Sequence, residues 1–423
     1  MDSTINMIKQ IRSQLEEDSR METHERVKRK REQSPETNNK RPHQKTERAR
    51  ERRRRKRERR RQRLLYEKKE EQRWKRPRSS DRDESEEGES AWKRPHMDEE
   101  RCDPLDISSY NFHHELGNGS FGNVMLASLP NRKKPVAIKI LKKENIKLKE
   151  RYETEVKVMK LAWKCPFLCN IHAAFQTQLH AFIVMEYASG GSLQDLLNNR
   201  GYLDMDSVLY YAAEMVCGLQ FLHSEGIIHR DFKPENILFS NKGHIKIADF
   251  GLAAENVFGN KTISGSIGTL HNMAPEMIQC QIYNSAVDWW AFGIVLCKMA
   301  TGRSPFYEGR KAEKCIHFIL NCQPSYSEQL STELQDLLEK LLKKKPYQRL
   351  GFKGDIRRHP FFKSINWIKV EIQNVEPPFQ PEPQPNPDVS IPASALEVLN
   401  IDTASTHSYS LQDFTYLSPS WQA

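Results

Sequence analysis

Two motifs in the middle of the chain constrain its fold more than any other feature. The segment HRDFKPEN runs from His229 to Asn236, and the triplet DFG begins thirteen residues later at Asp249. Phosphoryl transfer needs an aspartate beside the attacking hydroxyl, a lysine near the transferred phosphate, and side-chain oxygens that hold a divalent metal. The motifs supply these groups in a workable order. They predict a phosphoryl-transfer site with Asp231 and Lys233 as its catalytic residues.

A glycine-rich segment, GNGSFGNV, precedes these motifs and ends at Val124. Glycines let a turn lie over phosphate groups, so that backbone N–H groups face the oxygens without Cβ clashes. Alone, such a segment is a weak indication, because glycine-rich hairpins are common. The strand-like VAIK follows, and its Lys139 is spaced to reach the α- and β-phosphates. A lone strand lysine usually faces solvent, so this reading depends on the neighbours. The predicted nucleotide-binding residues here are Leu116, Gly117, Asn118, Gly119, Ser120, Phe121, Gly122, Val124, Ala137 and Lys139.

Lys139 needs an anionic partner, and the segment ERYETEVKVMKLA offers one. Its apolar residues recur at near-helical spacing between Val156 and Leu161, which predicts a helix. Glu155 is the expected partner of the lysine, with Glu153 as the alternative. A single glutamate on a helix usually faces solvent, so this assignment also rests on the neighbouring motifs.

The segment AFIVMEY, residues 181–187, is typical of a short buried strand that ends in polar residues. Such a strand suits a hinge between two lobes, where Met185 would line an adenine pocket. The backbone from Glu186 to Ala188 would offer hydrogen bonds. These three residues complete the predicted nucleotide site.

A long amphipathic helix is expected next, because apolar residues between 208 and 222 repeat at steps of four and three. Gly226 is its expected C-terminal cap, so the catalytic segment would hang from a rigid helix. Strands at 237–239 and 244–248 predict a hairpin. This hairpin would deliver Asp249 opposite the end of HRDFKPEN, which places two metal ligands on adjacent loops.

Three further motifs follow, APE at 274–276, DWWAFG at 288–293 and Arg349 in KPYQRLG. With this whole series in order, the chain resembles a eukaryotic protein kinase over residues 110–362. The resemblance implies an α+β fold of two lobes, a small β-rich N-terminal lobe and a larger helical C-terminal lobe. It also implies a buried salt bridge between Glu276 and Arg349.

The resemblance implies transfer of the γ-phosphoryl group of ATP to serine or threonine hydroxyls of protein substrates in intracellular signalling. Asp231 would orient the hydroxyl, Lys233 would steady the γ-phosphate, and Asn236 and Asp249 would hold two Mg²⁺ ions. The lysine in HRDFK indicates Ser/Thr rather than Tyr specificity. Two other readings are a pseudokinase scaffold and an RNA-associated factor. Retention of Lys139, Asp231, Asn236 and Asp249 together argues against the scaffold.

The residues after the kinase-like segment resemble the C-terminal tail of the protein kinase A, G and C (AGC) group, so 363–423 are predicted to form such a tail. The run LQDFTYL has Phe414 and Tyr416 as expected anchors on the small lobe, with Thr415 as a candidate phosphosite. Leu411 stands where a phenylalanine is usual. A disordered tail with scattered aromatics is the alternative. The tail and CPFLCNIHAAFQT are most similar to protein kinase C, whereas HRDFKPEN is more similar to other members of the group.

One departure from the family pattern lies before the APE motif. Gly265 stands where an activating phosphothreonine is common, and Arg230 normally binds that phosphate. Either a neighbouring hydroxyl substitutes, or the segment is ordered without phosphate. We favour Ser264 or Ser266 as the modified residue, which implies an upstream activating kinase as a partner.

The groove expected to hold the substrate departs from the pattern as well. Glu235 remains as one acidic residue suited to a basic substrate. Other residues stand at positions where acidic or aromatic side chains are usual, namely Ser192, His271, Asn272, Arg310, Lys311 and Lys314. These residues call the group's usual preference for arginine-rich substrates into question.

The net charge of +10 is concentrated near the N-terminus. Up to Pro104 there are 33 Lys and Arg against 24 Asp and Glu, which leaves a balance of +1 for the remainder. Residues 1–105 are poor in apolar side chains and rich in arginine, so we expect disorder or a solitary charged helix. Arginine runs such as the one at 48–63 attract nucleic acid, anionic membranes or import receptors, and nucleic acid and an import receptor are the candidate partners here. The alternative is a solvating tail that binds little.

The eight cysteines include no C-x-x-C pair, which fits a reducing cytoplasmic or nuclear compartment. The sequence contains no apolar signal-peptide core and no apolar run long enough to span a bilayer. A cytoplasmic location is expected, with the nucleus as the alternative. The resemblance implies a monomer. Zinc-finger lipid domains usual in protein kinase C are not visible, so regulation by diacylglycerol is not expected to carry over.

Overall fold

The computed structural model describes most of the chain after residue 101, in the segments 102–119, 122–143, 148–306, 312–326, 330–382 and 411–422. The region predicted to be disordered, 1–105, therefore lies outside the described residues apart from its last four positions. The arginine run at 48–63 lies wholly outside them.

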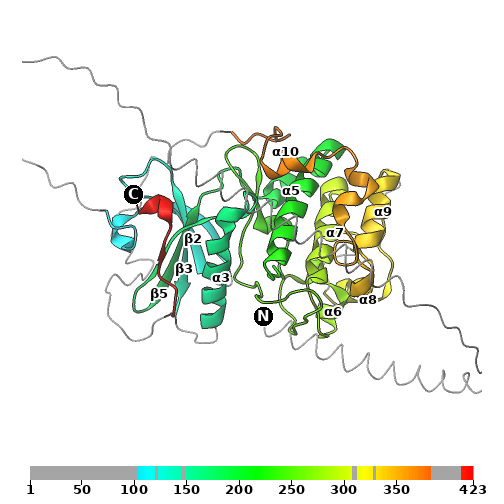
Figure 1. Cartoon of the computed structure of the whole chain (residues 1–423), viewed down its shortest axis with the longest axis horizontal. Helices are drawn as coiled ribbons and strands as arrows, with labels where there is room; N and C mark the ends of the chain where they lie inside the picture. The colour runs from blue at the N-terminus through cyan, green and yellow to red at the C-terminus, as the bar shows by residue number, and fades with distance from the viewer. Residues whose placement is uncertain are drawn as a thin grey trace, which may run out of the picture. The chain divides into compact units, whose positions relative to one another are not determined.

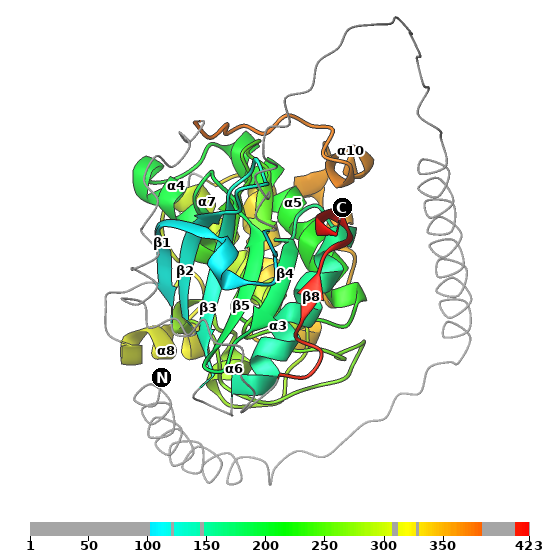
Figure 2. The ribbon, with the colours of Figure 1, turned by 90° about the vertical axis from the view of Figure 1, so that its left-hand side faces the viewer.

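The smaller lobe is built on an antiparallel sheet with the strand order β1-β2-β3-β5-β4-β8. One long helix, α3 (Lys149–Leu161), packs against it (Figures 1 and 2). The strand β8 comes from the C-terminal end of the chain and pairs with β4. The strands are β1 (Asn111–Gly119), β2 (Gly122–Ser128), β3 (Val136–Lys142), β4 (Ile171–Gln176), β5 (His180–Glu186) and β8 (Tyr416–Leu417), with short 3₁₀ turns η2 (Ile107–Ser109) and η4 (Ala162–Lys164).

The larger lobe is mainly helical and carries one short hairpin, which confirms the predicted α+β architecture of two lobes. Its helices are α4 (Leu193–Arg200), α5 (Met205–Ser224), α6 (Pro275–Ile278), α7 (Ala286–Thr301), α8 (Ala312–Asn321), α9 (Thr332–Leu341) and α10 (Trp367–Glu371). The hairpin joins β6 (Ile237–Phe239) and β7 (Ile245–Ile247). Short 3₁₀ turns are η5 (Pro234–Asn236), η6 (Leu270–Asn272), η7 (Pro346–Gln348), η8 (Ile356–Arg358), η9 (Pro360–Phe362) and η10 (Pro419–Trp421).

The helix α5 forms where the apolar repeat predicts it. The Asp204 side chain accepts a hydrogen bond from the Ser207 N–H at 2.8 Å and so caps its first turn. Its apolar residues lie in the main hydrophobic core, with Val208 and Leu219 fully buried. Gly226 adopts a left-handed φ of 75° just after the helix, as expected of a terminating glycine. The catalytic segment therefore starts from a fixed support.

The larger lobe is braced by an ion pair in its interior. Arg349 contacts both carboxylate oxygens of Glu276, with Nη2 at 2.6 Å from Oε2, and its side chain is fully buried. The same guanidinium also donates to the backbone carbonyls of Ala286, Lys343 and Lys344. The predicted salt bridge is confirmed. Because every donor finds an acceptor, the burial of this charge is compensated.

The C-terminal segment 411–422 docks on the smaller lobe, as expected for the tail. Phe414 is 1% exposed and lies in the same hydrophobic core as α3. Leu411 is also buried, whereas Tyr416 is only half-buried and has Lys160 over its ring. Trp421 adds an anchor that the sequence did not indicate, because its ring stacks on His172 with centroids 4.7 Å apart. Residues 383–410 of the predicted tail lie outside the described residues.

None of the helices in the described part of the chain combines the length and apolarity needed to cross a bilayer.

Candidate functional site

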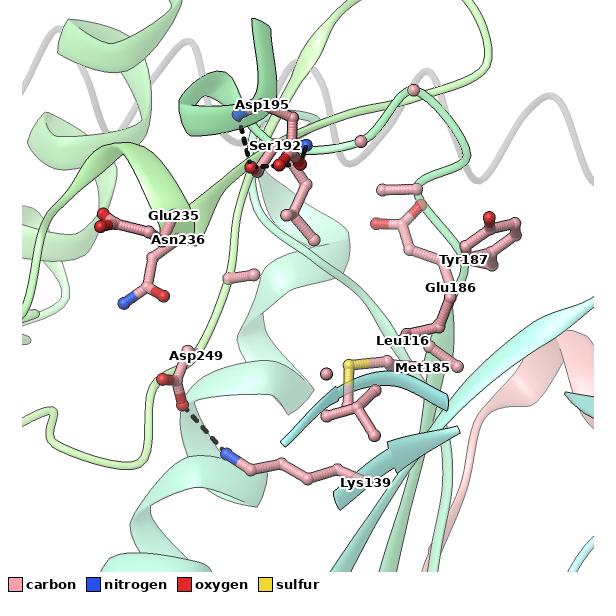
Figure 3. A pocket seen from close by; sticks show the side chains of 18 of the residues that line it. Leu116, Lys139, Met185, Glu186, Tyr187, Ser192, Asp195, Glu235, Asn236 and Asp249 are labelled. Carbon is pink, nitrogen blue, oxygen red and sulfur yellow. Dashed lines mark hydrogen bonds and ion pairs between the residues drawn. The ribbon is translucent and has the colours of Figure 1, made fainter. Parts of the chain in front are cut away.

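A cavity of about 960 Å³ lies where the smaller lobe faces the larger one. Its walls come from the glycine-rich strands, from β3 and β5, and from the segments around HRDFKPEN and DFG. Figure 3 shows the side chains that point into it, with Met185 and Leu116 on one side and Asn236 and Asp249 on the other. The motifs that lie far apart in the sequence thus converge on one space.

Lys139 stands at the floor of this cavity because β3 is a central strand of the sheet. Its Nζ lies 2.6 Å from Glu155 Oε1 and 2.9 Å from Asp249 Oδ1. Burial alone would lower the pKa of Lys139, but the two carboxylates raise it well above its ordinary value. The expected partner Glu155 therefore holds the lysine in its charged form. The alternative, Glu153, instead accepts a hydrogen bond from the Gln412 N–H of the tail at 2.9 Å.

The catalytic segment is tied to the larger lobe through a buried carboxylate. Asp288 of α7 accepts hydrogen bonds from the N–H groups of His229 at 2.9 Å and Arg230 at 3.0 Å. The His229 ring also pairs through Nε2 with the Ala248 carbonyl at 3.0 Å, just before DFG. Arg230 has a left-handed φ of 67°, unusual for a residue other than glycine. The lobe thus holds this strained backbone in one conformation.

Asp231 is 6% exposed and has both carboxylate oxygens engaged. Oδ2 accepts a hydrogen bond from Lys233 Nζ at 2.7 Å, and Oδ1 accepts one from the Thr269 N–H at 2.8 Å. Lys233 also donates to the Thr269 hydroxyl at 3.0 Å. These three residues line the cavity together. Their contacts fix the carboxylate and place a cation beside it, which is an arrangement suited to orienting a hydroxyl group.

Asn236 and Asp249, the two predicted metal ligands, lie on the same wall of the cavity (Figure 3). The Asn236 Nδ2 donates to the Asp231 carbonyl at 2.9 Å, which leaves the amide oxygen available as a ligand. Lys139 lowers the pKa of Asp249, so this carboxylate is anionic at neutral pH. Asp249 uses Oδ1 for the lysine and retains Oδ2. An amide and a carboxylate oxygen fit Mg²⁺, which commonly takes few protein ligands besides phosphate oxygens and water.

The hinge region forms the side of the cavity that the sequence indicated. Met185, Glu186 and Ala188 all line it. The Glu186 N–H is already used, because it donates to the Asn170 carbonyl at 3.0 Å. The Glu186 carboxylate likewise contacts Asn170 and, at 2.8 Å, Lys246 Nζ. Glu186 can therefore offer a ligand its carbonyl, and not its N–H group.

The glycine-rich strands close the cavity from above. The described members that line it include Leu116, Gly117, Asn118, Gly122, Val124 and Ala137. At Gly122, φ is 142° and a Cβ atom would lie 2.0 Å from the Ile140 carbonyl oxygen, so only glycine fits. Gly119 ends β1. The predicted nucleotide contacts Ser120 and Phe121 lie outside the described residues.

Several cavity residues were not predicted from the sequence. Met159 and Leu238 add apolar surface, and Phe379, Pro381 and Glu382 come from the tail. Phe379 is held by an edge contact with the Phe239 ring, with centroids 5.4 Å apart. Phe379 and Pro381 belong to the run PPFQP, residues 377–381, within the predicted tail. The position of this run in the predicted AGC-type tail is the sequence signal that could have placed it at the cavity.

Arg230, expected to bind an activating phosphate, is engaged elsewhere. Its guanidinium donates to the Leu252 carbonyl and, through Nη2 at 2.9 Å, to the Ala253 carbonyl. Gly265 has a φ of 129°, which a threonine rarely adopts. These contacts favour a segment ordered by its own backbone over one that needs a phosphate. Of the two candidate phosphosites in this segment, Ser264 is exposed, and the buried Ser266 hydroxyl oxygen finds no hydrogen-bond partner among the described residues.

The residues assigned to the substrate groove are spread over several elements. Glu235 is exposed and lines the cavity, whereas Ser192 caps α4 through a reciprocal pair of hydrogen bonds with Asp195. His271 Nδ1 lies 3.2 Å from the Cys315 sulfur. Lys314 is exposed on α8. Arg310 and Lys311 lie outside the described residues, and Thr415, the candidate phosphosite of the tail, is exposed.

Comparison with known proteins agrees with this geometry. The family model described as protein kinase domain matches residues 110–362. The chain is 43% identical to the protein kinase C delta type of Mus musculus over 287 residues, which cover 67% of the chain and 42% of that relative. It is 38% identical to the protein kinase C eta type of Rattus norvegicus over 292 residues, which cover 67% of the chain and 43% of that relative. Similarity to the protein kinase C epsilon type of Oryctolagus cuniculus is 37% over 295 residues, 68% of the chain and 40% of that relative. The chain spans about two fifths of the length of these curated relatives.

Proposed function

The chain belongs to the protein kinase domain family, and from this premise we propose that it phosphorylates proteins on serine or threonine with ATP as donor. One observation carries the proposal. A single cavity is lined by Lys139, Asp231, Lys233, Asn236 and Asp249, which together supply every group that phosphoryl transfer needs. Serine or threonine as acceptor follows from the lysine two residues after Asp231 and from the similarity to protein kinases C.

Asp231 orients the hydroxyl of the acceptor and takes its proton. The hydroxyl oxygen forms a new bond to the γ-phosphorus while the bond from this phosphorus to the β-phosphate oxygen breaks, so ADP leaves. Lys233, held 2.7 Å from the Asp231 carboxylate and 3.0 Å from the Thr269 hydroxyl, is placed to balance charge on the transferred group. The fixed position of these side chains lowers the entropy that must be lost in the transition state.

Lys139 binds the α- and β-phosphates, and Glu155 keeps the lysine pointed at them. Asn236 and Asp249 would hold Mg²⁺ through their free side-chain oxygens. Mg²⁺ held there would supply positive charge that offsets the negative charge of the ATP phosphates. The apolar side chains of Met185 at the hinge and Leu116 on β1 would enclose the adenine ring.

The decisive experiment measures Mg-ATP-dependent phosphorylation of neutral, basic and acidic Ser/Thr peptides by the full chain. Asp231→Asn and Asp249→Asn are expected to lower turnover by about a thousandfold, since each removes a group that acts on the transferred phosphate or the hydroxyl. Asp206→Asn is the matched control, because Asp206 is exposed on the first turn of α5 and its substitution removes the same charge. ATP binding is followed by thermal shift in parallel.

Ordinary turnover by either site variant would contradict the assigned roles. Absence of phosphorylation by the unmodified chain, together with measurable ATP binding, would favour the scaffold reading. The mutant series therefore separates the enzyme from a protein that only binds nucleotide.

The assignments for the remaining segments complete the proposal. Residues 1–105 form a basic region whose partner is nucleic acid or an import receptor, and residues 363–423 form the AGC-type tail of a monomeric, mainly cytoplasmic enzyme with access to the nucleus. A fusion lacking residues 1–105 that distributes in cells like the full chain would remove the import role. Salt-sensitive RNA binding lost in the same truncation would support the nucleic-acid role.

A further inference from the structure

A second cavity, of about 310 Å³, has a lining of one charge sign. Two cations, Lys298 and Arg303, face it together with His271 and uncharged polar groups such as Asn198 and Ser304. No acidic residue is among the described residues that line it. A concave site with several donors and no carboxylate suits an anionic ligand.

This basic cavity adjoins the phosphoryl-transfer site, because α4 and the short segment 269–271 contribute residues to both cavities. Ser192 and Asp195, at the first turn of α4, line the large cavity, whereas Asn198 on the same helix lines the basic one. Likewise, Thr269 contacts Asp231, and His271 faces the basic cavity two residues further on. A peptide whose hydroxyl lies at Asp231 therefore has a neighbouring side chain within reach of the basic cavity.

Lys298 is the central feature of this cavity. It lies half-buried near the end of α7, and within the described part of the chain its ammonium group makes no hydrogen bond and no ion pair. Burial lowers the pKa of Lys298, and the carboxylate of Glu235 opposes this effect from outside the cavity. A desolvated cation without a close partner gains from an incoming anion.

A simpler role for Lys298 is to complement the C-terminal end of the α7 dipole, since it lies in the last turn. A lysine in this position can also donate a hydrogen bond to one of the final backbone carbonyls. The carbonyl of Lys298 itself is taken by the Gly302 N–H, and the described residues offer the ammonium no such bond. Arg303, just beyond the helix, is exposed and also faces the cavity. The dipole alone does not account for both cations.

We propose that the basic cavity binds an acidic side chain of the peptide substrate, a carboxylate or a phosphate, next to the serine or threonine that is modified. The inference rests on the proposed kinase function and gives that function a substrate class. The chain then selects acidic peptides over the arginine-rich peptides that its family resemblance suggests. Among the residues that the structure describes, Glu235 is the carboxylate whose charge opposes the effect of burial, which lowers the pKa of both His271 and Lys298.

The test uses a peptide library in which Glu, phosphoserine or Arg replaces each position flanking one acceptor serine. We expect the full chain to prefer Glu or phosphoserine at one position by about tenfold in kcat/KM, as for a hydrogen bond to a charged group. Lys298→Glu should abolish or reverse this preference. Arg303→Glu should weaken it and serves as a second variant, because Arg303 is exposed and its change leaves the α7 core intact. Lys353→Glu is the matched control, since Lys353 is exposed in the same lobe and lines neither cavity.

Direct binding separates failure of this inference from failure of the kinase function. Fluorescent versions of the same peptides, with alanine at the acceptor, are titrated against each variant by polarisation. Tighter binding of the acidic peptide that is lost in Lys298→Glu and kept in Lys353→Glu supports the cavity even if no phosphate is transferred. Phosphorylation that favours Arg at every position, or an acidic preference unchanged by both Lys298→Glu and Arg303→Glu, overturns the inference while leaving the kinase function in place. A preference for phosphoserine without one for Glu would identify the ligand as phosphate.

Discussion

Replacing Phe414 with alanine is expected to release the docked C-terminal segment and so lower phosphotransfer. The catalytic residues themselves are untouched by this change. Phe414 is 1% exposed and packs in the same core as Val156 and Met159 of α3. That helix carries Glu155, which holds Lys139 in the nucleotide cavity. The effect on activity would therefore be transmitted through α3.

The magnitude follows from the contacts that hold the segment. Truncation of a buried phenylalanine to alanine costs about 3–5 kcal/mol. The main polar contacts with α3 are the bond from Lys160 Nζ to the Asp413 carbonyl at 2.9 Å and the bond from the Gln412 N–H to Glu153 at 2.9 Å. Each contributes about 1 kcal/mol. Loss of 3 kcal/mol changes the docking equilibrium by more than roughly a hundredfold, which these polar contacts cannot offset.

Two measurements check the argument. Hydrogen exchange of residues 411–422 reports docking, and kcat/KM with a Ser/Thr peptide reports the state of α3. For Phe414→Ala we expect fast exchange of the segment and a loss of kcat/KM of about tenfold or more. Ser420→Ala, at an exposed position of the same segment, should leave both unchanged. A variant with Phe414→Ala that exchanges rapidly but retains the original kcat/KM would refute the link from the tail to Glu155.

Two other perturbations have definite expected outcomes. The double substitution Ser264→Ala, Ser266→Ala should keep activity within about threefold of the unmodified chain, because the Arg230 guanidinium is held by backbone carbonyls; peptide kinase assays measure this. Docking of the tail should weaken as the pH falls from 6.5 towards 4, because burial lowers the pKa of His172 from 6.5 to about 4, and the released state then binds the extra proton. If release of the tail restores the ordinary pKa of His172, the free energy of docking changes by about 3 kcal/mol over this pH range. Hydrogen exchange of residues 411–422, measured as a function of pH, would show this change.

The contrary outcomes are equally definite. A loss of activity of more than tenfold in the double serine variant would show that a phosphate on this segment is needed, and an upstream kinase with it. For the pH effect, His172→Gln is the control, since glutamine keeps a polar planar group under Trp421 without titrating in this range. A docking curve that is the same for both proteins would assign the pH dependence to another group.

Much of the nucleotide site could be predicted because its residues are tied to short motifs. Lys139 follows from a strand at a set distance after the glycines, and Glu155 follows from the helical spacing of its neighbours. The order of Asp231, Asn236 and Asp249 along two adjacent loops indicates their common function. Local backbone geometry determines these relations, so a linear sequence carries them.

Other features depend on contacts between distant segments, which local patterns do not encode. Phe379 reaches the cavity only because the tail crosses the hairpin of the larger lobe. The two segments lie so close that a Cβ atom at Gly243 would be 1.9 Å from the Phe379 carbonyl oxygen. The basic cavity joins side chains of α4, η6 and α7, and no motif contains any two of them. The Arg230 guanidinium donates to the backbone carbonyls of Leu252 and Ala253, 22 and 23 residues further along the chain. Tertiary packing decides each of these positions.

The pairing of β8 with β4 has a consequence for the molecule as a whole. Without β8, the strand β4 would be the edge of the sheet, and Ala173 and Ala174 would lose their partners Leu417 and Tyr416. An open edge with apolar residues is a template for pairing with the strand of another molecule. Removal of residues 411–422 would therefore favour self-association at this edge. The short strand β8 covers the edge of β4, alongside which it runs (Figure 2).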